Sequence, residues 1–262
     1  MNIKLRHGTP FVYNEADDIV GLRDPDGSQK FPQLYGFPVL EYGSYTSVAL
    51  VTAAGTFTSL TYNTNAGKVR LNSAGAHGLT AAVAVGKHVY VTWATGNGVN
   101  GFYTVTALDA DTTGTAVTID LSYAEGLGTP TLAVAGTEVT LASVSLPADT
   151  LQLGRGLEFD ALFGLTGSTN NKVLKATLGG QTWYSQTVAA STQSMCVEKK
   201  ACASASNTVI SNAVAAPGHG AAAGANASLS VTFANTNTFA ITAAPATANE
   251  FVEITAWKLR IL

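Results

Sequence analysis

Short runs of apolar and threonine side chains, separated by glycine and asparagine, extend along the chain from about residue 46. β-Branched and aromatic residues dominate these runs, and turn-forming residues follow each run after a short interval. Both features are typical of the strands of a barrel or sandwich. The first expected strands are residues 47–51, 56–62, 68–71, 88–93, 102–108 and 116–121. The run 138–147 is expected to close this first group.

A second group of strands is expected beyond residue 146. The pair Gly179-Gly180 predicts a hairpin turn between two of its members. No segment longer than about ten residues shows a 3.6-residue period, so long helices are not expected. An alanine- and glycine-rich stretch, 211–230, is expected to form a long loop or weak strand. The expected strands are 157–163, 172–178, 182–187, 209–210, 229–233, 238–242 and 251–262.

The last expected strand carries apolar residues on both of its faces. Odd-numbered positions from Phe251 to Ile261 share one face, and even-numbered positions from Val252 to Arg260 share the other. Two apolar faces indicate burial on both sides, against the sandwich core and against another subunit. The candidate subunit interface therefore consists of Val252, Ile254, Trp257, Leu259 and Ile261.

Residues 1–45 show neither the two-residue period of a strand nor the 3.6-residue period of a helix. Residues 1–41 hold 10 of the 31 charged residues, and this region also contains four of the eight prolines. It includes the tight-turn sequence Asp24-Pro25-Asp26-Gly27. We expect an extended arm that is ordered against a neighbouring surface; packing back onto its own chain is the alternative. The candidate anchoring residues are aromatic: Phe11, Tyr13, Phe31, Tyr35 and Phe37.

The first eight residues contain basic side chains with no apolar run behind them, which does not fit a signal peptide. No window approaches the ~18 apolar residues of a membrane span. A chain kept in a cytosol-like compartment, or released by lysis, is therefore expected, with no membrane partner.

Charged residues make up only 12% of the chain, about half of the usual ~25%, and the net charge is −3. This balance excludes a strongly basic nucleic-acid-binding protein that acts by neutralising phosphates. It also argues against a disordered chain, which needs few apolar residues and a high net charge. So few surface charges would leave a monomer poorly soluble, so we expect other subunits to cover much of the surface.

Two segments resemble ligand-binding motifs but lack the required context. The stretch 96–101 fits G-x-G-x-x-G, yet it precedes an expected strand rather than the helix that would hold a pyrophosphate. A hairpin turn is the preferred interpretation. The stretch 109–120 resembles a calcium loop, but its fifth position is Thr113 and its twelfth, Asp120, is not the usual glutamate. We therefore expect a polar turn, and no metal or cofactor.

No recognisable catalytic motif occurs, and the four histidines are scattered. Glu158 and Asp160 share a strand face, which permits a glycosidase-like carboxylate pair, although solvated alternation is the favoured interpretation. Cys196 and Cys202 would lie about 20 Å apart on one strand, too far for a disulfide unless the chain turns between them. Free, buried thiols and a non-enzymatic protein are expected.

Several segments resemble proteins of tailed bacteriophages. The hairpin Val99-Asn100-Gly101-Phe102-Tyr103-Thr104-Val105-Thr106 is similar to one that recurs in their virion proteins. The segments 146–151, 172–175 and 251–257 resemble trimeric jelly-roll modules of phage head fibres, decoration proteins and tail fibres. The resemblance covers roughly residues 95–262 and implies a jelly-roll fold, a homotrimer and no catalytic residues.

Together these observations predict an all-β protein with an anchoring arm at 1–45, a small barrel or sandwich at 46–145 and a jelly-roll at 146–262. The expected function is a virion structural protein, assembled in the host cytoplasm, that decorates or cements a capsid or forms a head fibre. Its partners would be further copies of itself and a major capsid protein or another virion protein. The alternative is a receptor-binding tail fibre or lectin-like adhesin with a host surface glycan as partner, followed by a jelly-roll enzyme that processes polysaccharides.

Overall fold

The structure is a computed structural model that describes residues 4–5, 11–13, 19–23, 29–30, 40–44, 47–63, 67–109, 114–188, 192–216 and 224–262, the first four ranges without side chains. Almost every regular element in these ranges is a β-strand. The one helix described, α2 (Ala81–Ala84), has four residues. The all-β prediction is confirmed.

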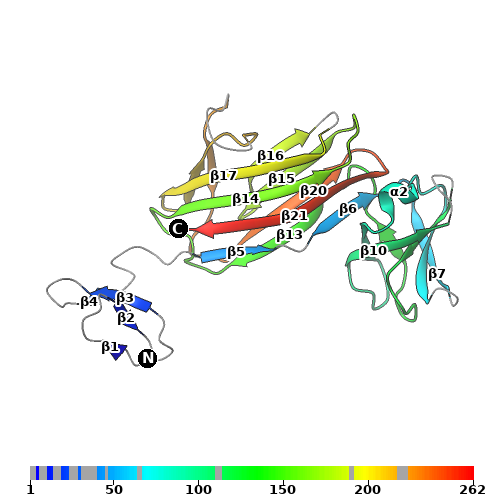
Figure 1. Ribbon diagram of the computed structural model, residues 1–262, viewed down its shortest axis with the longest axis horizontal. Helices are drawn as coiled ribbons and strands as arrows, with labels where there is room; N and C mark the ends of the chain where they lie inside the picture. Colours follow the sequence, from blue (N-terminus) through cyan, green and yellow to red (C-terminus); the bar gives the residue numbers. More distant parts are fainter. Residues whose placement is uncertain are drawn as a thin grey trace.

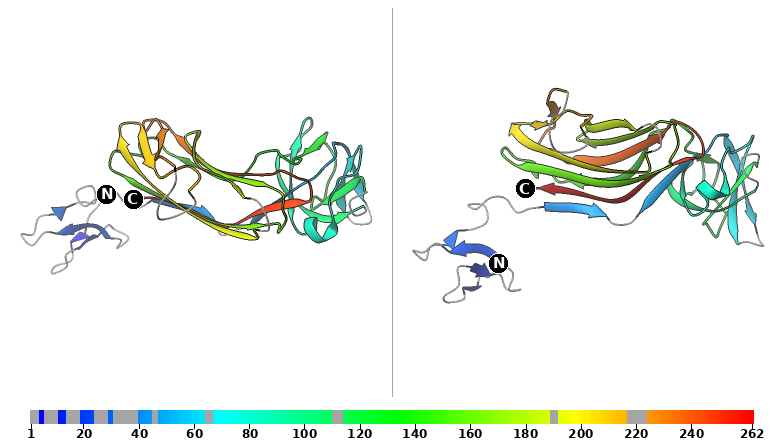
Figure 2. Two further views of the ribbon diagram at one scale, coloured as in Figure 1. Left: turned by 90° about the horizontal axis from the view of Figure 1, so that it is seen from above. Right: turned by 45° about the horizontal axis from the view of Figure 1, so that its top comes forward.

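Two antiparallel sheets form a sandwich at the centre of the molecule (Figures 1 and 2). In the first sheet, β5 (Leu40–Ser44) and β6 (Val48–Thr52) pair one after the other along β21 (Glu250–Ile261). The sheet continues through β14 (Gly156–Leu165), β17 (Ser194–Ala205), β18 (Thr208–Ser211) and β19 (Ala227–Ser230). The second sheet has the order β13 (Val139–Leu146), β20 (Asn237–Pro245), β15 (Lys172–Leu178) and β16 (Gln181–Val188).

The path of the chain through these sheets is that of a jelly-roll. The chain changes sheet between β6 and β13, β13 and β14, β14 and β15, β16 and β17, β19 and β20, and β20 and β21. Only β15 and β16, and the run from β17 to β19, stay within one sheet as hairpins. If β5 and β6 are counted as one strand and the added strands β18 and β19 are left out, eight strands remain. Their order in the two sheets gives the two Greek keys of a double-sheet jelly-roll. The expected jelly-roll is thus confirmed.

Aromatic side chains fill the space between the two sheets. Phe239 lies 5.0 Å from Phe159, 6.1 Å from Trp183 and 5.9 Å from Trp257, measured between ring centroids. The indole nitrogen of Trp183 donates a hydrogen bond to Ser211 Oγ at 2.9 Å, so the buried ring has no unpaired polar atom. This cluster fixes the spacing of the sheets.

A smaller β domain is inserted into the connection between β6 and β13. It contains β7 (Phe57–Asn63), β8 (Lys68–Ser73), α2, β9 (His88–Trp93), β10 (Gly101–Leu108), β11 (Ala116–Ile119) and β12 (Pro130–Leu132). Its strands have the order β12-β9-β10-β11-β8-β7 around a core of their own. Ala53 and Val134 form a parallel bridge, so the chain enters and leaves the inserted domain through neighbouring residues.

The domain limits differ from those expected. The strand that was predicted to close the 46–145 unit is β13, which pairs with β20 and buries Val139, Leu141 and Leu146 in the sandwich core. β5 and β6, which precede the inserted domain, also belong to the sandwich. Sequence order misassigned these strands because a jelly-roll pairs strands that are far apart along the chain.

The N-terminal region is not a wholly extended arm. The strands β1 (Lys4–Leu5), β2 (Phe11–Tyr13), β3 (Ile19–Arg23) and β4 (Gln29–Lys30) pair in sequence order as a small antiparallel sheet. In Figure 1 this sheet lies at one end of the molecule and the inserted domain lies at the other.

Candidate functional site

The candidate anchoring residues fall in the N-terminal region. Phe11 and Tyr13 lie on β2, at the two ends of that strand, and their side chains are not described. Phe31, Tyr35 and Phe37 lie outside the described residues. The structure therefore places two of the five on one strand, and anchoring by them stays a prediction.

The candidate subunit interface on β21 is wrong. All five residues lie in the core of their own sandwich: Val252 and Leu259 are fully buried and even Trp257 is only 8% exposed. The cause is a β-bulge, because Leu162 pairs with Ala256 whereas Phe163 pairs with Ile254. Thr255 is the extra residue, and it moves the inward face from even-numbered to odd-numbered positions.

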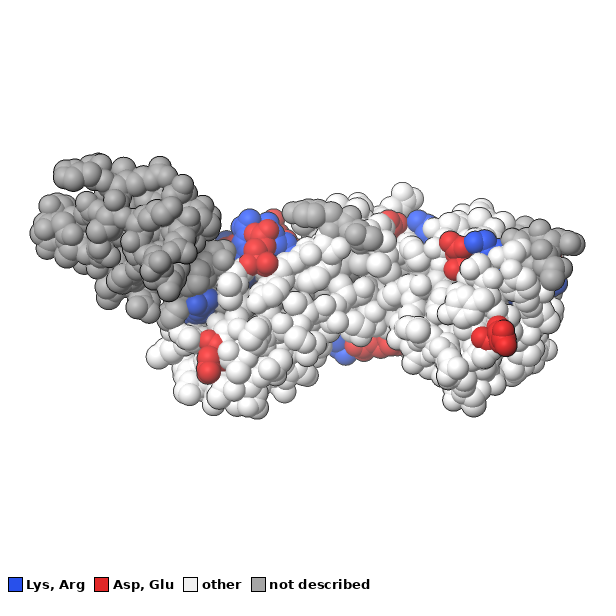
Figure 3. Space-filling model, turned by 90° about the horizontal axis from the view of Figure 1, so that it is seen from below, with Lys and Arg blue, Asp and Glu red and all other residues white. Residues whose placement is uncertain are grey.

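The outer face of the first sheet carries a row of alternating charges. Arg260 Nε lies 2.8 Å from Glu41 Oε2, and Arg260 Nη1 lies 3.6 Å from Glu158 Oε2. Lys200 Nζ completes the row at 2.8 Å from Glu158 Oε1, and this hydrogen bond lowers the pKa of Glu158 despite partial desolvation. In Figure 3 most of the surface is uncharged, and red and blue side chains mostly stand side by side.

The candidate carboxylate pair, Glu158 and Asp160, lies on the same face. Asp160 Oδ2 lies 3.6 Å from Lys258 Nζ, so Glu158 and Asp160 each face a cation on a neighbouring strand. Such cross-strand pairs are typical of a solvated sheet surface. The hydrogen bond from Lys200 lowers the pKa of Glu158 and so opposes the protonated state that the general acid of a glycosidase needs.

Of the two ligand-like segments, the glycine-rich one is a turn, and residues 110–113 of the calcium-like one lie outside the described residues. β9 and β10 pair as an antiparallel hairpin across 94–100, which confirms the turn interpretation of the glycine-rich stretch. A Cβ atom on Gly98 would lie 2.3 Å from Trp93 Cγ, so the close approach of the backbone to this indole requires glycine. In the calcium-like loop, Asp109 bonds to Arg70 Nη2 at 2.7 Å, and Asp120 forms an ion pair with Lys68.

Cys196 and Cys202 are free thiols, as expected, but they are exposed rather than buried. Both lie on the single strand β17, whose inward positions are Val197, Lys199 and Ala203. Of the histidines, His77 is buried and accepts a bond from Leu79 N at Nδ1, 2.9 Å away. His88 accepts one from Ala49 N at 3.3 Å, and burial lowers its pKa.

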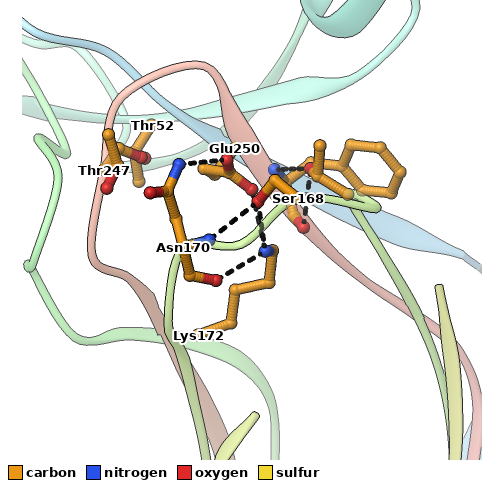
Figure 4. A network of polar contacts seen from close by, with 8 residues as sticks. Thr52, Ser168, Asn170, Lys172, Thr247 and Glu250 are labelled. Atoms are coloured by element: carbon orange, nitrogen blue, oxygen red, sulfur yellow. Dashed lines mark hydrogen bonds and ion pairs between the residues drawn. The ribbon is translucent and has the colours of Figure 1, made fainter. Parts of the chain in front are cut away.

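A buried polar network lies at the end of the sandwich where the chain leaves for the inserted domain (Figure 4). Lys172 Nζ pairs with Glu250 Oε2 at 2.9 Å, and Asn170 Nδ2 donates to Glu250 Oε1 at 2.9 Å. Burial opposes ionisation of Glu250, but hydrogen bonds from Lys172 and Asn170 outweigh it and lower its pKa. Next to it, Thr52 Oγ1 donates to Thr247 O at 3.1 Å.

A cleft of about 580 Å³ lies where the inserted domain meets the sandwich. Tyr90 and Thr92 of β9, and Thr131 of β12, form one wall. Glu138, just before β13, also lines the cleft. Its carboxylate accepts hydrogen bonds from Lys175 Nζ at 2.9 Å and from Thr242 Oγ1 at 2.7 Å, and these bonds hold its pKa below the usual value.

Sequence reasoning did not identify this cleft, because none of its strands carries a recognisable motif. The one signal in the sequence was the density of threonine among the apolar runs. Within the described ranges no group of three or more His, Cys, Asp or Glu is placed to hold a metal ion. None of the helices described has the length and apolar content needed to cross a membrane.

Comparison with known proteins gives no family assignment. No protein-family model matches the chain, and no curated protein matches it. Among solved structures, a chain from the structure of infectious bursal disease virus Gx strain matches with 10% sequence identity and a TM-score of 0.15. The match covers 86% of this chain and 79% of that one. A similarity of this size carries no conclusion about fold or function.

Proposed function

We propose that this chain is a non-enzymatic virion structural protein of a tailed bacteriophage, a capsid decoration or head-fibre protein attached through its N-terminal region. The observation that carries the proposal is the position of the two appendages on the jelly-roll. One is the N-terminal region and the other is the inserted domain, and they leave the sandwich at opposite ends of one strand.

The strand register defines these ends. Leu40, where the N-terminal region joins the sandwich, pairs with Ile261 at the end of β21. Thr52, where the chain leaves for the inserted domain, pairs with Glu250 at its start. β21 has 12 residues, so these ends are roughly 35 Å apart at ~3.3 Å per residue. A spacer with separate ends suits a protein that is held at one end and exposed at the other.

Self-association as a trimer is part of the proposal. With only 12% charged residues, the chain has a surface of low charge, and further copies would cover some of it. The residues of β21 that lie in the sandwich core cannot provide that interface. The outer face of the first sheet offers a different surface, where Leu162 is 44% exposed beside Cys196 and Ala256.

The attachment can be tested with a deletion of residues 2–39. The truncated chain keeps β5 and with it the complete first sheet of the sandwich, so it should fold. We expect it to be lost from particles produced by cells that make it in place of the full chain, as measured by quantitative immunoblotting of purified particles. Wild-type occupancy of the truncated chain would contradict attachment through this region.

A matched control removes the other appendage. Replacing residues 55–133 with a short glycine linker uses the bridge between Ala53 and Val134 and leaves the sandwich strands intact. This variant should remain on the particle at wild-type occupancy. If both deletions abolish occupancy, the sandwich or the assembly as a whole, and not the N-terminal region, determines attachment.

The alternative, a receptor-binding fibre or adhesin, is favoured by one observation. The cleft between the inserted domain and β13 lies at the end of the sandwich remote from the N-terminal region. An adhesin would need this end for adsorption to host cells. In that case the chain without residues 55–133 would still be incorporated into particles, but the particles would adsorb poorly.

A further inference from the structure

We infer that the cleft between the inserted domain and the sandwich binds a short neutral saccharide. Its volume of about 580 Å³ lies within the ~300–1,000 Å³ of typical small-molecule sites. Saccharide binding in this cleft is independent of how the protein attaches to a particle.

Three hydroxyl groups in the walls of the cleft have no hydrogen-bond partner among the described residues. They are the side-chain hydroxyls of Tyr90, Thr92 and Thr131. Thr92 and Thr131 are direct cross-strand partners, so their side chains emerge on the same face. Thr56 and Thr137 add two more hydroxyls at the rim. Each hydroxyl can both donate and accept, which matches the hydroxyls of a sugar.

The aromatic ring in this wall is held in place. Tyr90 is half-buried, and its ring contacts Phe102 in an edge-to-face arrangement with centroids 5.1 Å apart. Next to it Leu132 and Val139 are buried and Val134 is exposed, which gives the cleft apolar surface between its polar groups. A pyranose also alternates apolar C–H faces with hydroxyl edges, so both kinds of surface would be matched.

The charge of the cleft selects against ionic ligands. Among the described residues, Glu138 is the only ionisable residue that lines the cleft, apart from Tyr90. Lys175 neutralises this carboxylate, so the cleft has little attraction for a cation. None of the described residues that line the cleft is a Lys, Arg or His that could bind an anion. An ionised carboxylate has about four acceptor positions. Two of those on Glu138 are taken by Lys175, which bonds both oxygens, and a third is taken by Thr242. One strong acceptor remains for a sugar hydroxyl.

The inference can be tested on the full-length chain by saturation-transfer NMR and calorimetry. The probes are lactose, maltotriose, cellotriose and N-acetylated chitotriose, with sialyllactose and a heparin disaccharide as charged comparisons. We expect at least one neutral probe to bind with a Kd of about 1 mM or tighter, and the charged probes to bind more weakly. No binding by any neutral probe at about ten times that concentration, or preferred binding of a charged one, would overturn the inference.

Variants locate the binding to the cleft. Thr131→Val removes one exposed hydroxyl without changing shape and should raise the Kd about fivefold, the usual effect of one hydrogen bond. Tyr90→Ala should abolish binding, and if its melting curve shows that it does not fold, Thr131→Val and Glu138→Gln still decide. Thr61→Val, on an exposed position of β7, is the matched control and should bind like the wild type. Wild-type affinity of both Thr131→Val and Glu138→Gln would show that the saccharide binds elsewhere.

The saccharide site and the particle attachment can fail independently. The chain without residues 2–39 should still bind the saccharide but should no longer attach to the particle. The Thr131→Val variant should bind the saccharide more weakly but should still attach to the particle.

Discussion

Lys172 Nζ and Glu250 Oε2 lie 2.9 Å apart, and their side chains are only 2% and 5% exposed. Lys172 begins β15 and Glu250 begins β21, so the ion pair joins the two sheets of the sandwich. Lys172 Nζ also donates to Ser168 Oγ and Asn170 O, each at 3.0 Å. These additional bonds satisfy the buried ammonium group, which a buried ion pair requires if it is not to destabilise the fold.

Removing the cation should be strongly destabilising. Lys172→Met leaves the Glu250 carboxylate buried without its counter-ion and should lower the free energy of unfolding by about 3–5 kcal/mol. Lys68→Met, which removes an exposed ion pair with Asp120, should cost less than about 1 kcal/mol. Urea denaturation of the three proteins measures both effects. Equal effects of the two substitutions would contradict a structural role for the buried pair.

Because of Lys199, the free energy of unfolding should increase with pH in the alkaline range. It is 1% exposed, it donates to Ala213 O at 2.8 Å, and burial lowers its pKa to about 8. Between that value and its ordinary pKa of 10.5, the unfolded chain binds more protons than the folded one, so stability should rise with pH. Lys199→Met should remove this rise. Unfolding free energies at pH 7.5 and 9.5 test it, and an unchanged slope in the variant would assign the rise to other groups.

Gly98→Ala should destabilise the inserted domain. The new methyl group would lie 2.3 Å from Trp93 Cγ, and the overpacking should cost about 1–3 kcal/mol. Gly101→Ala is the matched control, because nothing lies within 4 Å of the position of its Cβ atom. Thermal melts followed by tryptophan fluorescence compare the two. The prediction fails if Gly101→Ala is the more damaging substitution.

Chelators should leave the protein unchanged. Asp109 and Asp120, the described carboxylates of the calcium-like loop, already pair with Arg70 and Lys68. The melting temperature should therefore be the same with and without EDTA. A decrease of several degrees in EDTA would indicate a bound metal, because a ligand that binds only the folded state raises its stability.

The chain should self-associate at micromolar concentration. Light scattering coupled to size-exclusion chromatography should give a mass that is a multiple of 26.9 kDa, three times that value for the proposed trimer. Leu162→Glu adds a carboxylate beside Asp160 on the outer face and should weaken the association if this face is the interface. A stable wild-type monomer would contradict self-association altogether.

The sequence by itself determined the local structure. Alternating apolar and polar positions specify strands because a strand turns successive side chains to opposite faces. Turn chemistry then located the hairpins: Gly179-Gly180 joins β15 to β16, and both glycines have positive φ. These are interactions between near neighbours, so one chain segment contains all the information needed to predict them.

Only the tertiary structure decided which face of a strand is buried and which strands meet. On β21, the strict alternation of inward and outward positions fails at Thr255. The bulge there arises from pairing with β14, nearly a hundred residues earlier in the chain. The same is true of β13, which resembles the strands before it and yet pairs with β20. The cleft combines Tyr90, Thr131 and Glu138 from three separate segments. Such long-range pairings depend on the burial of the whole core, which no single segment encodes.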